Sequence, residues 1–447
     1  MKQLLVLLFF FSPFVCVAQS TLQKEKLDDY LSLLEEHNQA VVTVAISKAN
    51  QLIYQNSNGY LSAAKNARIT PRTKFKIGSI TKTFTATIIF QLIDEGKMTT
   101  ATNLSEYFPD FRNAQKITIE QLLGHRSGIH NFTDDADFIS YANKPISKED
   151  LLGIMMKMPS DFEPGTKTSY SNSGYVMLGL IIEKETGKTY TQNLKSRIFT
   201  KLKLNNTSYG DKIEADKNEA NSMYFQGGKW VDYPLEWDMS VPYSAGAIVS
   251  IPADLNTFMY SLFNGQLVSE KSIAKMKEIQ NGLGHGIFRV PFHDKTGFGH
   301  NGKIESFNAG SYYFPLDDIN VTVLSNGTSM LFNDVLIGVL SMTFGREFEF
   351  PDFDKEIKLD VRLLNRYEGT FSSDQFPLKI IVKAQNGNLT AQATGQGAFP
   401  LTPTSSTEFK YDTAGIIMEF KSEDNTDDYE IFILKQGGQQ FTFKKEN

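Results

Sequence analysis

Residues 75–86 read Phe75-Lys76-Ile77-Gly78-Ser79-Ile80-Thr81-Lys82-Thr83-Phe84-Thr85-Ala86. From Ser79 to Glu95 apolar residues recur at helical spacing, and Gly96 follows as a C-terminal stop. This pattern predicts a buried helix that begins at Ser79. Because Lys82 comes one helical turn later, its side chain shares a face with Ser79, about 4.5 Å further along the axis.

This placement suits a serine nucleophile with a neighbouring proton acceptor. A free lysine is protonated at pH 7, so Lys82 can act as a base only where burial or positive neighbours lower its pKa. The unpaired N–H groups at the helix start could also stabilise an oxyanion. The spacing alone is weak evidence, because Ser62–Lys65 and Ser272–Lys275 share it. The glycine before Ser79 and the apolar helix after it distinguish this pair.

A second candidate element is Tyr170-Ser171-Asn172. The turn Pro164-Gly165 precedes it and the apolar run 176–182 follows, so we expect a loop held between a turn and a helix. The triplet also occurs at Tyr54–Asn56 and Tyr141–Asn143, so it proves nothing by itself, and the alternative for Tyr170 is an ordinary half-buried aromatic residue on a loop. Functional residues often lie on loops of this kind.

A third element is a basic residue followed by x-Gly, and the chain offers Lys295-Thr296-Gly297 and His300-Asn301-Gly302. In this order the three elements resemble the motifs of the serine β-lactamase and penicillin-binding-protein superfamily, particularly the class C β-lactamase and D-alanyl-D-alanine carboxypeptidase branch. The resemblance covers roughly residues 25–345. It is supported by Leu122-Leu123-Gly124-His125-Arg126-Ser127-Gly128 and Tyr243-Ser244-Ala245-Gly246.

The resemblance favours His300 over Lys295 for the third motif. Members of this family keep an aromatic residue seven positions after the basic one, and Phe307 stands there for His300 whereas Lys295 has Gly302. We therefore interpret Asp294–Gly297 as a hairpin turn between two strands.

The resemblance implies a role for each catalytic residue. Ser79 is acylated, Lys82 helps to deprotonate it, and Tyr170 relays a proton between Ser79 and the leaving group. Lys82 and Tyr170 both remain candidates for the dominant base.

The resemblance also implies substrate-binding residues. Asn172 bonds to the substrate amide, and His300 with Gly302 lines the opposite wall. The backbone N–H groups of Ser79 and Lys303 form the oxyanion hole.

Two residues depart from the family pattern. Asn301 and Ser306 stand where other residues are frequent, which puts the substrate in doubt more than the nucleophile.

A histidine with an ordinary pKa of about 6.5 is only partly charged at neutral pH. We therefore expect His300 to bind a substrate carboxylate less strongly than a lysine would, which favours a peptidase or esterase over an efficient β-lactamase.

The expected fold is α/β. Both ends of the first 345 residues are β-rich and the middle has helical periodicity and caps, such as the capping box at residues 118–121. We expect an antiparallel sheet assembled from both chain ends, flanked by helices, with a helical insertion. The predicted strands are 40–47, 51–59, 285–290, 300–307, 310–314 and 319–324, and the predicted terminal helices are 21–36 and 331–344.

The domain prediction has four parts: a signal peptide at 1–18, a β-lactamase-like hydrolase domain at 19–345, a linker at 346–360, and a small β-barrel or sandwich at 361–447. The linker is charged and lacks periodicity. Six short alternating runs predict the strands of the last domain: 378–383, 388–393, 408–411, 416–421, 429–434 and 440–444.

The N-terminus reads as a secretory signal, with Lys2, a short apolar core and Ala18 before the expected cleavage point. A membrane anchor fits less well, because the apolar stretch is broken at Ser12-Pro13 and is shorter than the ~20 residues that span a bilayer. Bulky residues before Cys16 disfavour a lipid anchor. Cys16 is the only cysteine, so the exported chain would hold no thiol and no disulfide.

Composition excludes other classes of function. The 447 residues carry a net charge of −6 without a long basic run, which argues against a nucleic-acid partner. We expect no metal and no cofactor, because the histidines lack metal-ligand spacing. For His125 a structural hydrogen bond is the better interpretation. Trp230 and Trp237 could form the rim of a cleft or pack in the core, and the sequence favours neither position.

These observations predict an exported serine hydrolase, periplasmic or secreted, that forms an acyl-enzyme at Ser79. Its expected substrates are small molecules or peptides with amide or ester bonds, first of all D-amino-acid peptides of the cell-wall type. The alternative on the same site is an esterase or a weak β-lactamase. A non-catalytic muropeptide-binding protein is the alternative of another class, and the complete motif set disfavours it. The sequence leaves the oligomeric state open.

Overall fold

The computed structural model describes residues 22–446, apart from 65–66, 354–358, 360, 386–387, 395–396, 412–413, 423–428 and 437–438. The predicted signal peptide, with Cys16, lies outside the described residues. Within the described part of the chain no helix is long and apolar enough to cross a membrane.

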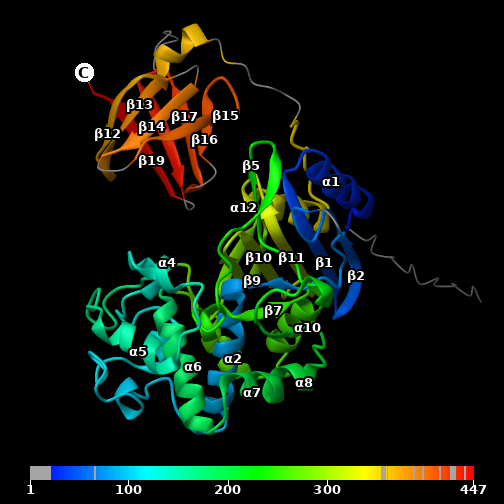
Figure 1. The fold of residues 1–447 in the computed structure, drawn as a ribbon, viewed down its shortest axis with the longest axis vertical. Helices are drawn as coiled ribbons and strands as arrows, with labels where there is room; N and C mark the ends of the chain where they lie inside the picture. Colours follow the sequence, from blue (N-terminus) through cyan, green and yellow to red (C-terminus); the bar gives the residue numbers. More distant parts are fainter. Residues whose placement is uncertain are drawn as a thin grey trace, which may run out of the picture.

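An antiparallel sheet joins the two ends of the first unit (Figure 1). Its strand order is β2-β1-β11-β10-β9-β8. In the centre of the sheet β1 pairs with β11, and Val44 lies opposite Val323. The N-terminal hairpin therefore lies directly beside the last strand of the unit. This confirms the prediction of one sheet built from both chain ends. The strands are β1 Ala40–Lys48, β2 Gln51–Ser57, β8 Phe288–Phe292, β9 Lys295–Ile304, β10 Phe307–Phe314 and β11 Ile319–Thr328.

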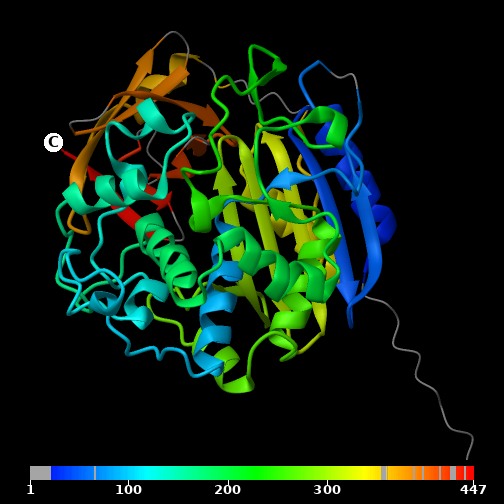
Figure 2. The same cartoon turned by 60° about the horizontal axis from the view of Figure 1, so that its bottom comes forward.

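Helices cover both faces of this sheet. The terminal helices α1 (Lys24–Glu36) and α12 (Phe332–Thr343) share one apolar cluster with β1 and β11. On the other face α10 (Pro252–Phe263) packs on β1, β10 and β11, and Figure 2 shows it in front of the strands. Because both faces are covered, nearly every residue of β1 and β11 is buried.

The insertion is helical, as predicted, and is centred on α2 (Thr81–Asp94). Residues 81–92 are all buried, which is typical of a helix packed on every side. Phe84 of α2 stacks on Phe258 of α10 at 3.6 Å between ring centroids. The remaining helices of the insertion include α3 Ile119–Leu123, with the predicted capping box, α4 Phe138–Tyr141, α5 Lys148–Lys157, α6 Asn172–Thr186, α7 Tyr190–Leu194, α8 Thr200–Leu202, α9 Tyr243–Gly246 and α11 Glu270–Met276.

Short strands connect these elements. β3 (Phe75–Lys76) and β4 (Ser208–Tyr209) both pair with β7 (Ile248–Ser250), and β5 (Met223–Gln226) forms a hairpin with β6 (Lys229–Asp232).

The edge strand β8 differs from the prediction. It begins at Phe288, three residues after the expected start, and the turn that follows is at His293-Asp294. Lys295, Thr296 and Gly297 are therefore not in the turn, as predicted, but in β9, where they pair with Phe292, Pro291 and Val290. The pairing with β8 extends β9 to the ten residues Lys295–Ile304.

The C-terminal residues form a closed β-barrel rather than a sandwich. Its interior is filled by aromatic side chains such as Phe371, Phe420 and Phe432. The prediction of six strands was wrong, because it missed Gly369–Ser373 and Phe399–Pro403, which are short and contain Gly, Ser or Pro. The strands that the structure describes are β12 Gly369–Ser373, β13 Phe376–Gln385, β14 Asn388–Ala393, β15 Phe399–Pro403, β16 Glu408–Tyr411, β17 Ile416–Lys421, β18 Ile431–Gln436 and β19 Gln439–Lys445.

The segment after α12 packs on α1. The ring of Tyr30 lies 5.2 Å from that of Phe348 and 5.5 Å from that of Phe350, and His37 lies 5.5 Å from Phe353. We therefore propose that the hydrolase unit continues to residue 353 instead of ending at 345.

Candidate active site

Ser79 lies in a single 3₁₀ turn, η1 (Gly78–Ile80), directly before α2. Gly78 has a φ of +50°, and a Cβ there would lie 2.9 Å from the backbone N of Lys303, so only glycine fits this approach. Lys82 is in the first turn of α2 and is fully buried. Its Nζ lies 3.0 Å from Oγ of Ser79, as the helical spacing predicted.

Lys82 also bonds to two acceptors. Its Nζ donates to Oδ1 of Asn172 at 2.7 Å and to the carbonyl oxygen of Ala245 at 2.8 Å. Burial lowers the pKa of Lys82 well below its ordinary value, and no charged neighbour among the described residues offsets this. In its neutral form this amine has two N–H donors, and with both directed at these acceptors its lone pair would face the hydroxyl of Ser79.

Asn172 is the first residue of α6, and Ser171 caps that helix through its hydroxyl. The orientation of the Asn172 amide is set by its other contacts: Nδ2 donates to Oγ1 of Thr133 at 2.9 Å, and the backbone N donates to Oδ1 of Asn131 at 2.9 Å. The oxygen of the amide therefore faces Lys82.

Tyr170 lies on the loop before α6, half-buried, and its ring centroid is 4.9 Å from Nζ of Lys82. Burial raises the pKa of the Tyr170 phenol above its ordinary value, and a hydrogen bond with Ser79 offsets this only in part. The ring stacks on His125 at 4.4 Å between centroids. His125 accepts a hydrogen bond at Nδ1 from the backbone N of Ser171 at 3.1 Å, which matches the structural contact predicted for it.

His300 faces the same site from β9, with its ring centroid 6.4 Å from that of Tyr170. Its Nδ1 donates to the carbonyl oxygen of Asn301, and its Nε2 is buried without a partner among the described residues. Burial, with a smaller contribution from Lys82, lowers the pKa of His300 to about 3. The expectation of a partly charged His300 at neutral pH was wrong, because the tertiary structure removes this ring from water.

Gly302 brings β9 against the turn that carries Ser79. A Cβ at this position would lie 2.0 Å from the carbonyl oxygen of Ile77 and 3.1 Å from the backbone N of Ser79. The close approach places the backbone of Lys303 next to that of Ser79, and both residues line one hollow of about 300 Å³. Lys295 lies elsewhere: its Nζ pairs with Asp317 at 2.6 Å.

The structure thus brings together Ser79, Lys82, Tyr170, Asn172, His300, Gly302 and Lys303. No group of three His, Cys, Asp or Glu side chains that could hold a metal ion occurs among the residues that the structure describes.

A family model and several known proteins match this chain. The family model described as Beta-lactamase matches residues 28–336. The chain belongs to the Beta-lactamase family. Putative penicillin-binding protein PbpX of Bacillus subtilis is 29% identical over 254 residues, which are 57% of this chain and 62% of that protein. Penicillin-binding protein 4* of the same organism is 24% identical over 445 residues, covering 94% of this chain and 98% of that protein.

Another relative and two solved structures are also similar to this chain. A teichoic acid D-alanine hydrolase of Staphylococcus aureus is 27% identical over 60% of this chain and 65% of its own length. The D-amino acid amidase of Ochrobactrum anthropi SV3, solved with L-phenylalanine, has a TM-score of 0.64 and 26% identity over 71% of this chain and 98% of its own. An octameric penicillin-binding protein homologue from Pyrococcus abyssi has a TM-score of 0.65 and 23% identity over 94% and 100% of the two chains, which shows the shared fold.

Some contributors to this Beta-lactamase-family site were missed from the sequence. The carbonyl of Ala245 holds Lys82, but a backbone oxygen leaves no side-chain signal, although the string 243–246 resembles a family segment. Thr133 was missed because it lies far from Asn172 in sequence. Trp237 lines the hollow with Ser79, whereas Trp230 lines a different one.

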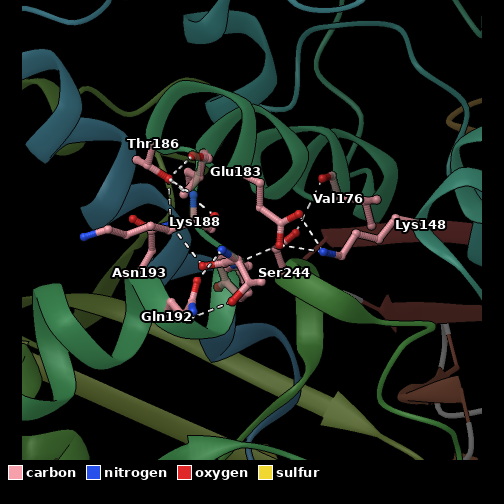
Figure 3. Close-up of polar contacts among 11 residues, drawn as sticks. Lys148, Val176, Glu183, Thr186, Lys188, Gln192, Asn193 and Ser244 are labelled. Atoms are coloured by element: carbon pink, nitrogen blue, oxygen red, sulfur yellow. Dashed lines mark hydrogen bonds and ion pairs between the residues drawn. The ribbon is translucent and has the colours of Figure 1, made fainter.

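A polar network supports α9, which carries Ala245. The hydroxyl of Ser244 donates to the carbonyl oxygen of Tyr175 at 2.8 Å. It also lies 3.5 Å from the carbonyl oxygen of Val176, and on the same helix α6 Glu183 accepts from Nζ of Lys148 at 2.6 Å (Figure 3). A Cβ at Gly179 would lie 2.1 Å from Oγ of Ser244, so the Ser244 side chain of α9 packs directly on the backbone of α6 there. The acceptor for Lys82 is therefore fixed by the packing of α9.

Proposed function

We propose that this chain is an exported serine hydrolase that forms an acyl-enzyme on Ser79 and cleaves amide or ester bonds at D-amino acid residues, first of all in peptides of the cell-wall type. One observation carries the proposal. A buried lysine with a lowered pKa places its Nζ 3.0 Å from the Ser79 hydroxyl and bonds its hydrogens to two other acceptors. The exported location rests on the predicted signal peptide.

In acylation, Oγ of Ser79 attacks the substrate carbonyl carbon while its proton passes to the lone pair of Lys82. The electron pair of the carbonyl bond moves to the oxygen, and the backbone N–H groups of Ser79 and Lys303 stabilise that charge. When the tetrahedral intermediate collapses, the bond to the leaving group breaks. The leaving amine or alcohol takes a proton, and Ser79 keeps the acyl group as an ester.

Tyr170 is suited to give that proton. Because burial raises its pKa, the phenol stays protonated at neutral pH and is a poor base. Lys82, with its lowered pKa, is the better base. The proton that Lys82 has accepted then restores the Tyr170 phenolate to the phenol. In deacylation a water molecule gives a proton to Lys82 as its oxygen adds to the ester carbonyl carbon, the bond from that carbon to Oγ of Ser79 breaks, and Ser79 regains a proton as the acid product leaves.

The names of relatives support D-amino acid substrates. One relative is a teichoic acid D-alanine hydrolase and one structural neighbour is a D-amino acid amidase. The neutral state of His300 supports a second candidate on the same site, an esterase, because the site lacks a fixed cation there for a substrate carboxylate.

Turnover by wild type and Ser79→Ala tests the proposal. The panel holds a peptide ending in D-Ala-D-Ala, a D-alanyl ester and nitrocefin. We expect the wild type to hydrolyse the peptide or the ester faster than nitrocefin, and Ser79→Ala to lose the activity. Ser272→Ala is the matched control, because Ser272 precedes Lys275 at the same spacing. Equal turnover by Ser79→Ala rejects the nucleophile, and a wild type that acts on nitrocefin alone rejects the substrate class.

A further inference from the structure

Two successive carbonyl groups at the end of α9 are held by side chains of α2. A helix of four residues leaves its last carbonyls without partners of its own, and those of Ser244 and Ala245 are of this kind. The carbonyl oxygen of Ala245 accepts from Nζ of Lys82 at 2.8 Å. The carbonyl oxygen of Ser244 accepts from the hydroxyl of Thr85 at 2.6 Å. Because Thr85 comes one helical turn after Lys82, a single face of α2 holds both carbonyls.

A tyrosine of a third helix supports Thr85. The hydroxyl of Tyr190, the first residue of α7, lies 2.6 Å from Oγ1 of Thr85. Thr85 has one hydroxyl hydrogen and gives it to the carbonyl of Ser244, so Tyr190 is the donor in this pair. The hydrogen bonds therefore run in one direction, from Tyr190 through Thr85 to Ser244. Thr85 is fully buried and Tyr190 is 1% exposed, so water does not compete for these bonds.

The backbone of α9 is strained where this chain of hydrogen bonds ends. Tyr243 has a φ of +40°, a left-handed conformation that residues other than glycine rarely adopt. Such a conformation persists only where the surrounding structure holds it. The ring of Tyr243 packs on that of Tyr190 at 5.3 Å between centroids, and the hydroxyl of Thr85 anchors the next residue. Without that hydroxyl, the buried carbonyl of Ser244 would lose its partner and α9 would relax.

We infer that Thr85 and Tyr190 are positioning residues for the proton acceptor Lys82. They fix the carbonyl of Ala245, which holds Nζ of Lys82 at 3.0 Å from Oγ of Ser79. Neither Thr85 nor Tyr190 lines the hollow beside Ser79, so a change in either should affect the rate of the reaction more than the binding of substrate. This inference rests on the proposed function and extends it from the groups that react to the groups that hold them in place.

Paired substitutions at Thr85 test the inference. Thr85→Val keeps the shape of the side chain and removes the hydroxyl, whereas Thr85→Ser keeps the hydroxyl. We measure kcat and KM with the peptide or ester that the wild type hydrolyses fastest. Thr85→Val should lower kcat about tenfold or more with less than about a threefold change in KM, and Thr85→Ser should stay within about threefold of the wild type. Tyr190→Phe, which removes only the donor, should lower kcat about three- to tenfold.

Thr87→Val is the matched control. Thr87 is a fully buried threonine of the same helix, and its hydroxyl donates to the carbonyl oxygen of Thr83 at 2.8 Å, within α2 itself. This variant should keep kcat within about threefold, and thermal unfolding shows that each variant is folded at the assay temperature. A normal kcat in Thr85→Val, an equal loss in Thr85→Ser, or an equal loss in Thr87→Val overturns the inference.

A double-mutant cycle tests the route through Lys82. The rate at which a fluorophosphonate labels Ser79 is measured in the wild type, Thr85→Val, Lys82→Ala and the double variant. Thr85→Val should slow labelling about tenfold in the wild type and less than about threefold in the Lys82→Ala background. If Thr85→Val does not fold, Tyr190→Phe takes its place in the cycle and should slow labelling about three- to tenfold in the wild type alone.

The cycle also separates the inference from the proposed function. Equal slowing in both backgrounds, or labelling of Thr85→Val as fast as that of the wild type, contradicts the positioning role and leaves Ser79 as the nucleophile. A wild type whose Ser79 is not labelled contradicts the proposed function instead.

Discussion

At the scale of single residues, burial shifts the pKa values of three titratable groups around Ser79. It lowers the pKa of Lys82 and of His300 and raises that of Tyr170, so burial favours the neutral form of each group. A neutral amine can accept the proton of Ser79 and a neutral phenol can donate one. The motif residues could be predicted from the sequence because they are side chains at fixed spacing, but their protonation states depend on burial that only the tertiary structure creates.

The pH dependence of kcat/KM tests the state of Lys82. The base is active when neutral, so activity should fall as pH falls through the lowered pKa of Lys82 and stay level above it. Lys82→Arg keeps a positive charge at every accessible pH and should lose about 10²-fold or more throughout the range. A profile that rises toward acid pH, or normal turnover by Lys82→Arg, would contradict the assignment.

His300 gives a separate prediction. Since its pKa is lowered to about 3, the ring gains a proton only far below neutral pH and does not titrate between about pH 5 and 8. His300→Gln should therefore leave the position of the acid limb unchanged even if it lowers the rate. The measurement is the pH profile of kcat/KM for the wild type and for His300→Gln. An acid limb near pH 6.5 that disappears in His300→Gln is the contrary result.

At the scale of elements, the site depends on the contact between β9 and η1. Long periodic elements such as α2, β1 and β11 were predicted well because each carries many buried apolar residues. The turn at His293-Asp294 was missed because pairing with β8, rather than local sequence, determines where β9 begins. The contact of Ala245 with Lys82 could not be predicted at all, because it comes from the packing of α9.

Gly302→Ala tests this contact. The added Cβ would meet the carbonyl oxygen of Ile77 at 2.0 Å and must push β9 away from η1, which moves the backbone N–H of Lys303. We expect kcat to fall by about 10²-fold or more, the usual cost of losing an oxyanion-hole donor. Gly153→Ala is the control, since nothing lies within 4 Å of a Cβ there. Thermal unfolding of both variants accompanies the kinetics, and a normal kcat for Gly302→Ala would disprove the contact's role.

At the scale of the whole molecule, the sheet that unites both chain ends makes the first unit depend on segments far apart in sequence. The barrel of β12–β19 has an apolar core of its own, separate from the two clusters of the first unit. The existence of a second β unit could be predicted from its alternating short runs. Its strand number could not, because β12 and β15 have too little apolar pattern to recognise.

Two truncations test where the first unit ends. A chain of residues 19–353 keeps the contacts of Phe348, Phe350 and Phe353 with α1, whereas a chain of residues 19–345 exposes Tyr30. We expect the shorter chain to unfold several degrees lower, because burial of each aromatic side chain contributes about 1.5–3 kcal/mol. Calorimetry of both chains checks this. Equal unfolding temperatures would instead support an end of the first unit at residue 345.

The most direct test of the central claim is mass spectrometry of the intact protein after reaction with a fluorophosphonate, followed by mapping of the modified peptide. The hydroxyl of Ser79 should displace fluoride, so the wild type should gain one phosphonyl group on that residue. Ser272→Ala should gain the same group, Lys82→Ala should react more slowly, and Ser79→Ala should remain unmodified. A label that maps to another residue, or that persists at the same rate in Ser79→Ala, would contradict the account.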